Sequence, residues 1–93
     1  MEPHRIRLRD PWIVEPPNRH RRKFGKPTNI DTSAVIVLMF TGMSGTTRIE
    51  LNGAVVGEFD EPSFEIDVTK LLQSRNELMV ETDQRGEVSI EIR

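Results

Sequence analysis

The chain has 93 residues, no cysteine and a formal net charge of −2, with 35% hydrophobic and 30% charged residues. This length predicts one domain over residues 1–93 with a thin core, and the composition is that of a folded rather than a disordered chain. The absence of cysteine excludes disulfide bonds and thiolate metal sites. Residues 1–30 carry eight Lys or Arg against three Asp or Glu, whereas residues 31–93 carry five against twelve. These opposite surpluses can attract each other within one molecule or between two.

Short alternating or apolar runs, separated by Pro, Gly and Asn, follow one another along the whole chain. The runs lie at residues 5–9, 12–15, 19–24, 34–40, 46–51, 54–59, 64–68, 77–82 and 87–92. Period-two alternation and β-branched content are typical of strands, and the run at 34–40 is apolar enough for a central strand. Strands at this spacing, with almost no helix, predict an all-β antiparallel sandwich of about eight short strands.

The connections carry local signals of their own. Asn52-Gly53 lies between two strand-like runs and predicts a type I′ hairpin turn, because both central residues need positive φ. Residues 69–72 are expected to form one short helical turn, capped by Asp67 or Thr69. Asn76 suits a left-handed position. The last two strands are expected to pair as a hairpin through residues 83–86.

At this point a group of spaced residues resembles a known family. The residues are Arg21, Arg22 and Phe24; Val37, Leu38, Phe40 and Gly42; Ile49, Leu51, Asn52, Gly53, Val56 and Gly57; Phe64, Asp67, Val68, Thr69, Leu71 and Leu72; and Asn76, Leu78 and Val80. Their order and spacing resemble the sugar-binding jelly-roll domain of the family-two glycoside hydrolases, the relatives of β-galactosidase and β-glucuronidase. The resemblance runs from about residue 19 to residue 80.

The resemblance implies a galactose-binding-like fold and an architectural companion of a catalytic domain. With only residues 58–63 between the hairpin and Phe64, this is a minimised version with shorter loops than usual, and the chain has no room for the catalytic barrel. The matching residues are turn, core and capping positions, so the resemblance transfers no catalytic or sugar-contacting residue.

Two features are candidates for ligand binding. Trp12 is the only tryptophan, and an exposed ring could stack on a sugar, although a lone Trp in a small sandwich is more often part of the core. The second is the basic run, which consists of Arg19, Arg21, Arg22 and Lys23. It could bind nucleic acid or another anion, or it could be a solvated strand whose charges meet the acidic half of the chain.

The strand at 34–40 raises the question of a partner. If Ile36, Leu38 and Phe40 face the core, then Val35, Val37 and Met39 face outward. Either the segment around Trp12 or a second subunit should cover these three side chains, and an uncovered apolar stripe would be a binding patch for a protein partner or a second copy.

No arrangement of residues indicates catalysis. Ser44 lies between Gly42 and Gly45, which is better explained as a turn than as a nucleophile, and no His, Asp or Glu spacing predicts a metal site or a cofactor. No signal peptide or membrane helix is visible, so the expected location is cytoplasmic. We therefore expect a non-catalytic binding or interaction module, with carbohydrate as one ligand, a protein partner or self-assembly as the alternative, and nucleic acid as a distant third.

Overall fold

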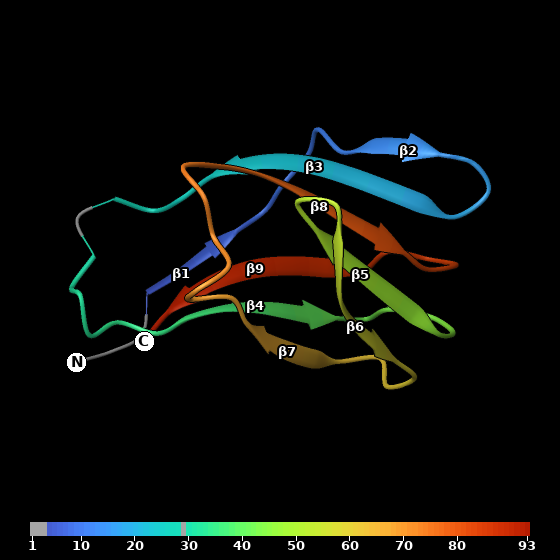
Figure 1. Ribbon diagram of the computed structural model, residues 1–93. Helices are drawn as coiled ribbons and strands as arrows, with labels where there is room; N and C mark the ends of the chain where they lie inside the picture. The colour runs from blue at the N-terminus through green and yellow to red at the C-terminus, as the bar shows by residue number, and fades with distance from the viewer. Residues whose placement is uncertain (1–3, 29) are drawn as a thin grey trace.

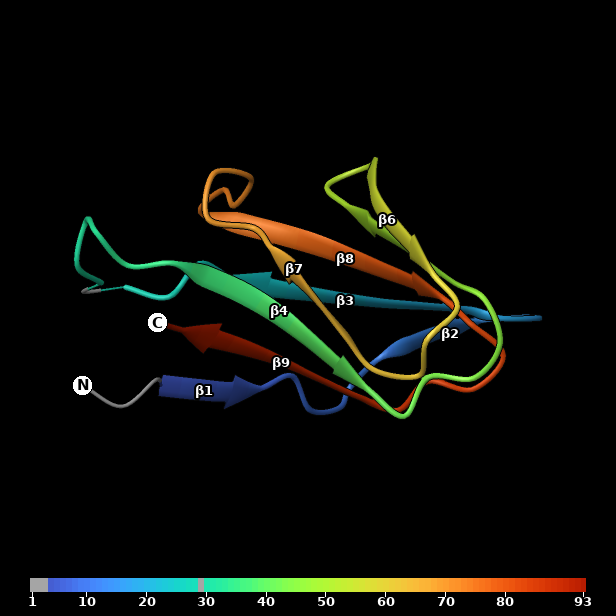
Figure 2. The same ribbon diagram turned by 90° about the horizontal axis from the view of Figure 1, so that it is seen from below.

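The fold consists of two antiparallel β-sheets packed face to face. The computed structural model describes residues 4–28 and 30–93, and Figures 1 and 2 show the two sheets as two layers. One sheet has the order β1 (His4–Arg7), β9 (Glu87–Ile92), β4 (Ile36–Thr41) and β7 (Phe64–Asp67). The other has the order β2 (Ile13–Glu15), β3 (Arg19–Gly25), β8 (Arg75–Glu81), β5 (Thr47–Leu51) and β6 (Ala54–Phe59). The predicted sandwich is confirmed, with nine strands over the described residues.

The core lies between the inner faces of the two sheets. The side chains that face the core follow the period-two alternation expected of a sandwich, while β4 and β8 also bury Val37 and Met79 on their outer faces. The fully buried centre comprises Leu38, Phe40, Ile49, Val68, Leu78, Val80 and Val88. Towards the β6 and β7 edge, Phe64 stacks on both Phe40 and Phe59, with ring centroids 4.8 and 4.0 Å apart. These rings lie at the edge where β6 and β7 come together, and Figure 1 shows the two strands there.

The hairpin between β5 and β6 has the predicted turn. Asn52 and Gly53 have φ angles of 54° and 85°, which match the positive values that a type I′ turn requires. Further along the hairpin, the register shifts between Ile49 and Glu50, which pair with Gly57 and Val55. Val56 is left unpaired at this bulge, and such a bulge increases the local twist of β6 at the edge of the sheet.

The expected helical turn after β7 is a single hydrogen-bonded turn and not a helix. The Asp67 carboxylate accepts hydrogen bonds from the backbone N–H and the hydroxyl of Thr69, at 2.9 and 2.6 Å. The N–H of Leu72 bonds to the carbonyl of Val68, which closes the turn. Within the described residues no helix has the length and the apolar character needed to cross a membrane.

The prediction that the last two strands pair as a hairpin is wrong. β8 pairs with β3 and β5 in one sheet, whereas β9 pairs with β1 and β4 in the other. The connection between them crosses from layer to layer, and Gly86 lies directly against the backbone of Thr41 and Gly42. Alternating side chains show which face of a strand is buried, but they do not identify its neighbour, and this is why the sequence suggested a hairpin.

Asn76 does not take the predicted left-handed conformation, since Asn52 is the only non-glycine residue with positive φ among those described. Asn76 is instead buried in β8. Its side-chain oxygen accepts from the N–H of Gln73, and its amide donates to the carbonyls of Gln73 and Phe24. It therefore ties the loop before β8 to the end of β3.

Two glycines give a matched test of this geometry. A Cβ on Gly86 would lie 2.0 Å from the carbonyl oxygen of Thr41, so Gly86→Ala forces the backbone of the β8–β9 connection to move. We expect a loss of more than about 3 kcal/mol in the free energy of unfolding. A Cβ on Gly53 would meet nothing within 4 Å, so Gly53→Ala carries only the conformational cost of its positive φ, about 1–2 kcal/mol. Urea denaturation of both variants checks the difference, and equal losses would contradict the crossover at Gly86.

Candidate functional site

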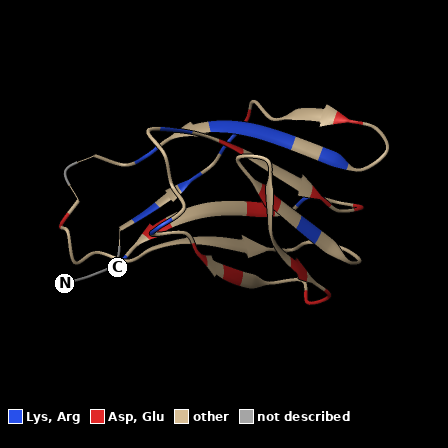
Figure 3. Cartoon of the chain, viewed as in Figure 1, with Lys and Arg blue, Asp and Glu red and all other residues tan. Residues whose placement is uncertain are grey.

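The basic run in β3 is divided between two faces of its sheet. Arg22 pairs with the buried Leu78 and so lies on the inner side, whereas Arg21 pairs with Met79 on the outer side. Neighbouring residues alternate, so the outer side carries Arg19, Arg21 and Lys23. Figure 3 shows that β3 holds the longest basic segment of the fold. The four residues of the predicted basic site therefore do not form one patch.

On the outer side, ion pairs neutralise much of this charge. The guanidinium of Arg21 binds the carboxylates of Glu15 on β2 and Glu77 on β8, and Arg19 lies 3.4 Å from Glu81. The hydrogen bond and charge of Glu15, followed by those of Glu77, raise the pKa of Arg21 above its ordinary value. Most of these partners come from the acidic half of the chain, so the opposite surpluses meet within one molecule.

The remaining two basic residues of the run have separate surroundings. Arg22 donates to the backbone carbonyls of Arg9 and Lys23, at 2.6 and 2.7 Å, and so ties β3 to the segment before β2. Lys23 is exposed at the end of β3, where it faces a groove described below.

Trp12 belongs to the core and is only 9% exposed. Its indole N–H donates to the carbonyl of Leu8 at 3.1 Å. The guanidinium of Arg85 lies over the ring, 4.2 Å from its centroid, in a cation–π contact. This location agrees with the interpretation of Trp12 as part of the core. A sugar could stack on this ring only by displacing the cover, and ligand binding by Trp12 stays a prediction.

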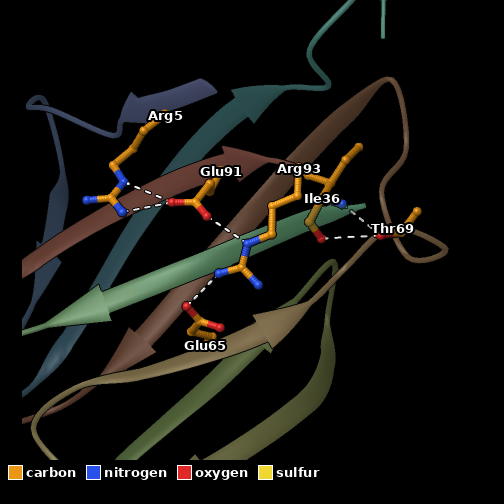
Figure 4. Close-up of polar contacts among 6 residues, drawn as sticks. All are labelled: Arg5, Ile36, Glu65, Thr69, Glu91 and Arg93. Atoms are coloured by element: carbon orange, nitrogen blue, oxygen red, sulfur yellow. Dashed lines mark hydrogen bonds and ion pairs between the residues drawn. The ribbon is translucent and has the colours of Figure 1, made fainter. Parts of the chain in front are cut away.

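On the outer face of the β1–β9–β4–β7 sheet, the side chains of the apolar strand β4 are partly covered by neighbouring residues. Val37 is only 3% exposed, Met39 is half-buried, and Val35 is 39% exposed. Neither the Trp12 segment nor a second subunit is needed to bury Val37. Figure 4 shows the side chain of Arg93 reaching across β4 between Glu91 and Glu65. Thus Val35, Val37 and Met39 do not form an exposed stripe, and partner binding by them stays a prediction.

The side-chain contacts of Arg93 and Glu91 link β1, β9 and β7, across the β4 strand that lies between β9 and β7. Arg93 donates through Nε to Glu91 at 2.7 Å and through Nη2 to Glu65 on β7 at 2.6 Å. The second oxygen of Glu91 accepts two hydrogen bonds from Arg5 on β1, the shorter at 2.7 Å. Hydrogen bonds from Arg93 and then from Arg5 lower the pKa of Glu91, while Glu91 and Glu65 raise that of Arg93.

A groove lies where the hairpin turn meets the start of β8, and we call it the hairpin groove. It has a volume of about 500 Å³. Its lining consists of Lys23, Phe24, Gly25, Asn52, Arg75, Asn76 and Glu77. Of these residues, only Lys23 was a candidate from the sequence. The others come together because β3, β8 and the β5–β6 turn meet at one end of the sheet, and the sequence carries no local signal for that meeting.

The asparagines hold the walls of the hairpin groove in place. The side-chain oxygen of Asn52 accepts from the backbone N–H of Glu77 at 2.9 Å, and its amide donates to the side-chain oxygen of Asn76 at 3.1 Å. Both side chains are thus engaged with the protein. The groups left to meet a ligand are the charged side chains of Lys23 and Arg75 and the second carboxylate oxygen of Glu77, whose first oxygen accepts from Arg21.

Ser44, which the sequence analysis weighed as a nucleophile, makes hydrogen bonds that join two loops. The hydroxyl of Ser44 accepts from the N–H of Gln84, and its carbonyl accepts from the hydroxyl of Thr82, so the segment joins the β4–β5 connection to that between β8 and β9. Over residues 4–28 and 30–93, no group of three or more His, Asp or Glu side chains could hold a metal ion.

Comparison with known proteins points to one family. Residues 4–92 match the family described as the galactose-binding domain-like domain of glycosyl hydrolase 2. No curated protein matches the chain.

Solved structures of glycoside hydrolases contain a similar fold. A β-D-glucuronidase from Dictyoglomus thermophilum aligns with 97% of the chain at a TM-score of 0.80 and 12% identity. A β-glucuronidase from Bifidobacterium dentium, complexed with coumarin-3-O-glucuronide, aligns with 70% at a TM-score of 0.64 and 28% identity. A β-D-mannosidase from D. thermophilum aligns with 69% at a TM-score of 0.60 and 31% identity. The chain spans only 28%, 11% and 8% of these three proteins, respectively.

The lowered pKa of Glu91 predicts a pH-dependent contribution to stability. Because the ionised form is favoured in the fold, this contribution is complete above the ordinary carboxyl pKa of about 4.5 and is lost as the pH falls through the lower pKa of the folded state. Glu91→Gln should therefore lower the thermal unfolding midpoint at neutral pH, with a difference from the parent that shrinks below about pH 4.5.

Thermal unfolding from pH 7 to pH 2 measures this difference. The carboxyls of Asp31 and Asp67, whose pKa values are lowered mainly by hydrogen bonds from Ser33 and Thr69, remain in both proteins and cancel in the comparison. A difference that stays constant over the whole range would show that the ionised carboxylate is not what Arg5 and Arg93 stabilise.

Proposed function

The chain belongs to the galactose-binding domain-like family of glycosyl hydrolase 2, and we propose that it serves as a non-catalytic module of a glycoside hydrolase that contacts carbohydrate through the hairpin groove. Membership of a family of non-catalytic β-sandwich domains supports the role as a module. The share of each matched enzyme that the chain spans, 28% or less in the three described above, supports it too, since a module accompanies the domain that carries out the reaction.

The hairpin groove is the observation that supports carbohydrate contact. Its volume falls in the range typical of small-ligand sites. Lys23 and Arg75 can donate hydrogen bonds to sugar hydroxyls, and the carboxylate oxygen of Glu77 that does not bind Arg21 can accept them. The bonds of Asn52 and Asn76 keep the walls fixed, so little conformational entropy is lost on binding.

Weak binding is expected from the same geometry. Phe24 is the only aromatic residue in the lining, and it is buried, so no exposed ring offers a stacking surface in the groove. Binding then depends on hydrogen bonds that must replace those to water, each of which yields a small net gain. We expect a dissociation constant of about 1 mM or weaker.

A second candidate function is docking against another protein through β2. Ile13 and Val14 are 62% and 59% exposed on this three-residue edge strand, the two most exposed large apolar side chains of the described chain. This location favours β2 over the face of residues 35–39 that the sequence suggested. Binding of nucleic acid through β3 has less support, because Arg19 and Arg21 are ion-paired and Arg22 bonds to backbone carbonyls.

The carbohydrate proposal is tested by titrating the ¹⁵N-labelled chain with galactose and with mannose. These neutral sugars suit a family described as galactose-binding-like with a mannosidase among its structural matches. We expect fast-exchange shifts confined to the amides of Gly25, Asn52 and Asn76, with Lys23→Ala weakening the shifts several-fold because a donor is lost.

The matched control is Lys70→Ala, which removes an exposed lysine outside the groove and should leave the titration unchanged. Shifts scattered over the whole surface, or none at sugar concentrations well above 1 mM, would reject the groove as a carbohydrate site. In that case, association of the chain with a separately expressed catalytic domain, lost on Ile13→Glu, would favour the docking function.

A further inference from the structure

A second hollow lies at the other end of β8, and we call it the arginine groove. It has a volume of about 270 Å³. Its lining consists of Arg7, Leu8, Arg9, Asp10, Arg85 and Glu87. These residues come from the end of β1, the segment that follows it, the β8–β9 connection and the start of β9. Three arginines therefore meet two carboxylates in one small hollow, which leaves a positive surplus.

Arg85 is the most buried of these cations that lack a close carboxylate. Its side chain is only 20% exposed, and its Nε atom is buried without a hydrogen-bond acceptor. One terminal nitrogen donates to the carbonyl of Gly86 at 3.1 Å, and the other lies 3.7 Å from Asp10, beyond hydrogen-bond distance. Burial lowers the pKa of Arg85, the charge of Asp10 opposes this shift, and the like charge of Arg7 adds to it. A buried cation with incomplete pairing is costly.

The protein's own carboxylates do not complete the pairing. Glu87 is bound to Arg7 at 3.0 Å, and the side chain of Asp10 is 84% exposed and points largely into water. Arg9 contributes its backbone carbonyl to Arg22, while its exposed side chain has no ion pair among the described residues. Arg9 and Arg85 are thus the two guanidinium groups in the groove that no carboxylate of the described residues approaches within hydrogen-bond distance.

The position of Arg85 is fixed by Trp12. The guanidinium lies over the indole at 4.2 Å, and the indole is held by its bond to Leu8. A planar guanidinium fixed by stacking is preorganised for two parallel hydrogen bonds to an oxyanion. The core position of Trp12 thus has a consequence for binding, because the ring orients the cation of Arg85.

We propose that the arginine groove binds the oxyanion group of a small ligand, a carboxylate, sulfate or phosphate held between Arg85 and Arg9. The oxyanion accepts hydrogen bonds from both guanidinium groups and supplies the charge that Asp10 supplies only from a distance. The site is separate from the hairpin groove, which lies at the opposite end of β8, so it goes beyond the carbohydrate contact proposed above.

Fluorescence of the sole tryptophan tests this proposal in the full chain. Because Arg85 lies over Trp12, an anion that binds Arg85 changes the surroundings of the indole. The chain is titrated with sodium glucuronate, sulfate and phosphate at constant ionic strength maintained with chloride. We expect a saturable change for at least one of them, and the tightest of the three identifies the oxyanion. Galactose, which is uncharged, should leave the emission unchanged whether or not it binds the hairpin groove.

Three variants test whether the anion binds at Arg9 and Arg85. Arg9→Gln should weaken binding about tenfold, because one charge-assisted donor is lost from an exposed side chain. Arg85→Lys should abolish the response, and its circular dichroism shows whether the fold is kept. Arg48→Gln removes an exposed arginine on β5, outside the groove and without an ion pair among the described residues, and should titrate like the parent. A linear response to all salts, or equal affinity in the parent and Arg9→Gln, would overturn the proposal.

Discussion

The structure depends on arginines that bridge two carboxylates across the outer face of each sheet. Val37 and Met79 are each 3% exposed, yet both lie outside the core cluster between the sheets. Met79 pairs with Arg21, which joins Glu15 to Glu77, and Val37 pairs with Glu91, which Arg93 joins to Glu65. A chain of 93 residues has too few apolar side chains to cover both faces of two sheets. Long charged side chains cover them instead, because their aliphatic stems pack on apolar surface while their heads pair.

The same arrangement limits where function can lie. Charged side chains that bridge the strands are not available to bind a ligand. Arg19 and Arg21, which the sequence suggested as an anion site, are ion-paired in this way. Surface ion pairs contribute little stability one by one, but a carboxylate as buried as Glu91 requires its partners. Cations that remain incompletely paired, such as Arg85, are therefore more informative about binding than the longest basic run.

Much of the fold could be predicted from the sequence, because its signals are local. The Asn52-Gly53 turn, the alternation in β7 and the cap at Asp67 each depend on neighbours within a few residues, and all three are present. Pairings between distant segments could not be predicted. The crossover after β8, the hydrogen bonds of Asn76 and the cover over Val37 all depend on which strands become neighbours, and a period of two carries no information about that. The hairpin groove and the arginine groove could not be predicted for the same reason, since each is lined by at least two segments far apart in the sequence.

The two grooves differ in how their polar groups are used, and this difference argues for different ligands. In the hairpin groove the amides of Asn52 and Asn76 are paired with each other and with the backbone, so the walls are rigid and the remaining polar groups are charged side chains at the rim. In the arginine groove the central group itself is held rigid, by Trp12, while its charge is only partly balanced. A rigid frame with both donors and an acceptor suits a weakly bound neutral sugar, whereas a fixed cation with unmet hydrogen bonds suits one oxyanion. Because β8 separates the two grooves, a small ligand in one leaves the other accessible, and their occupancies should be independent.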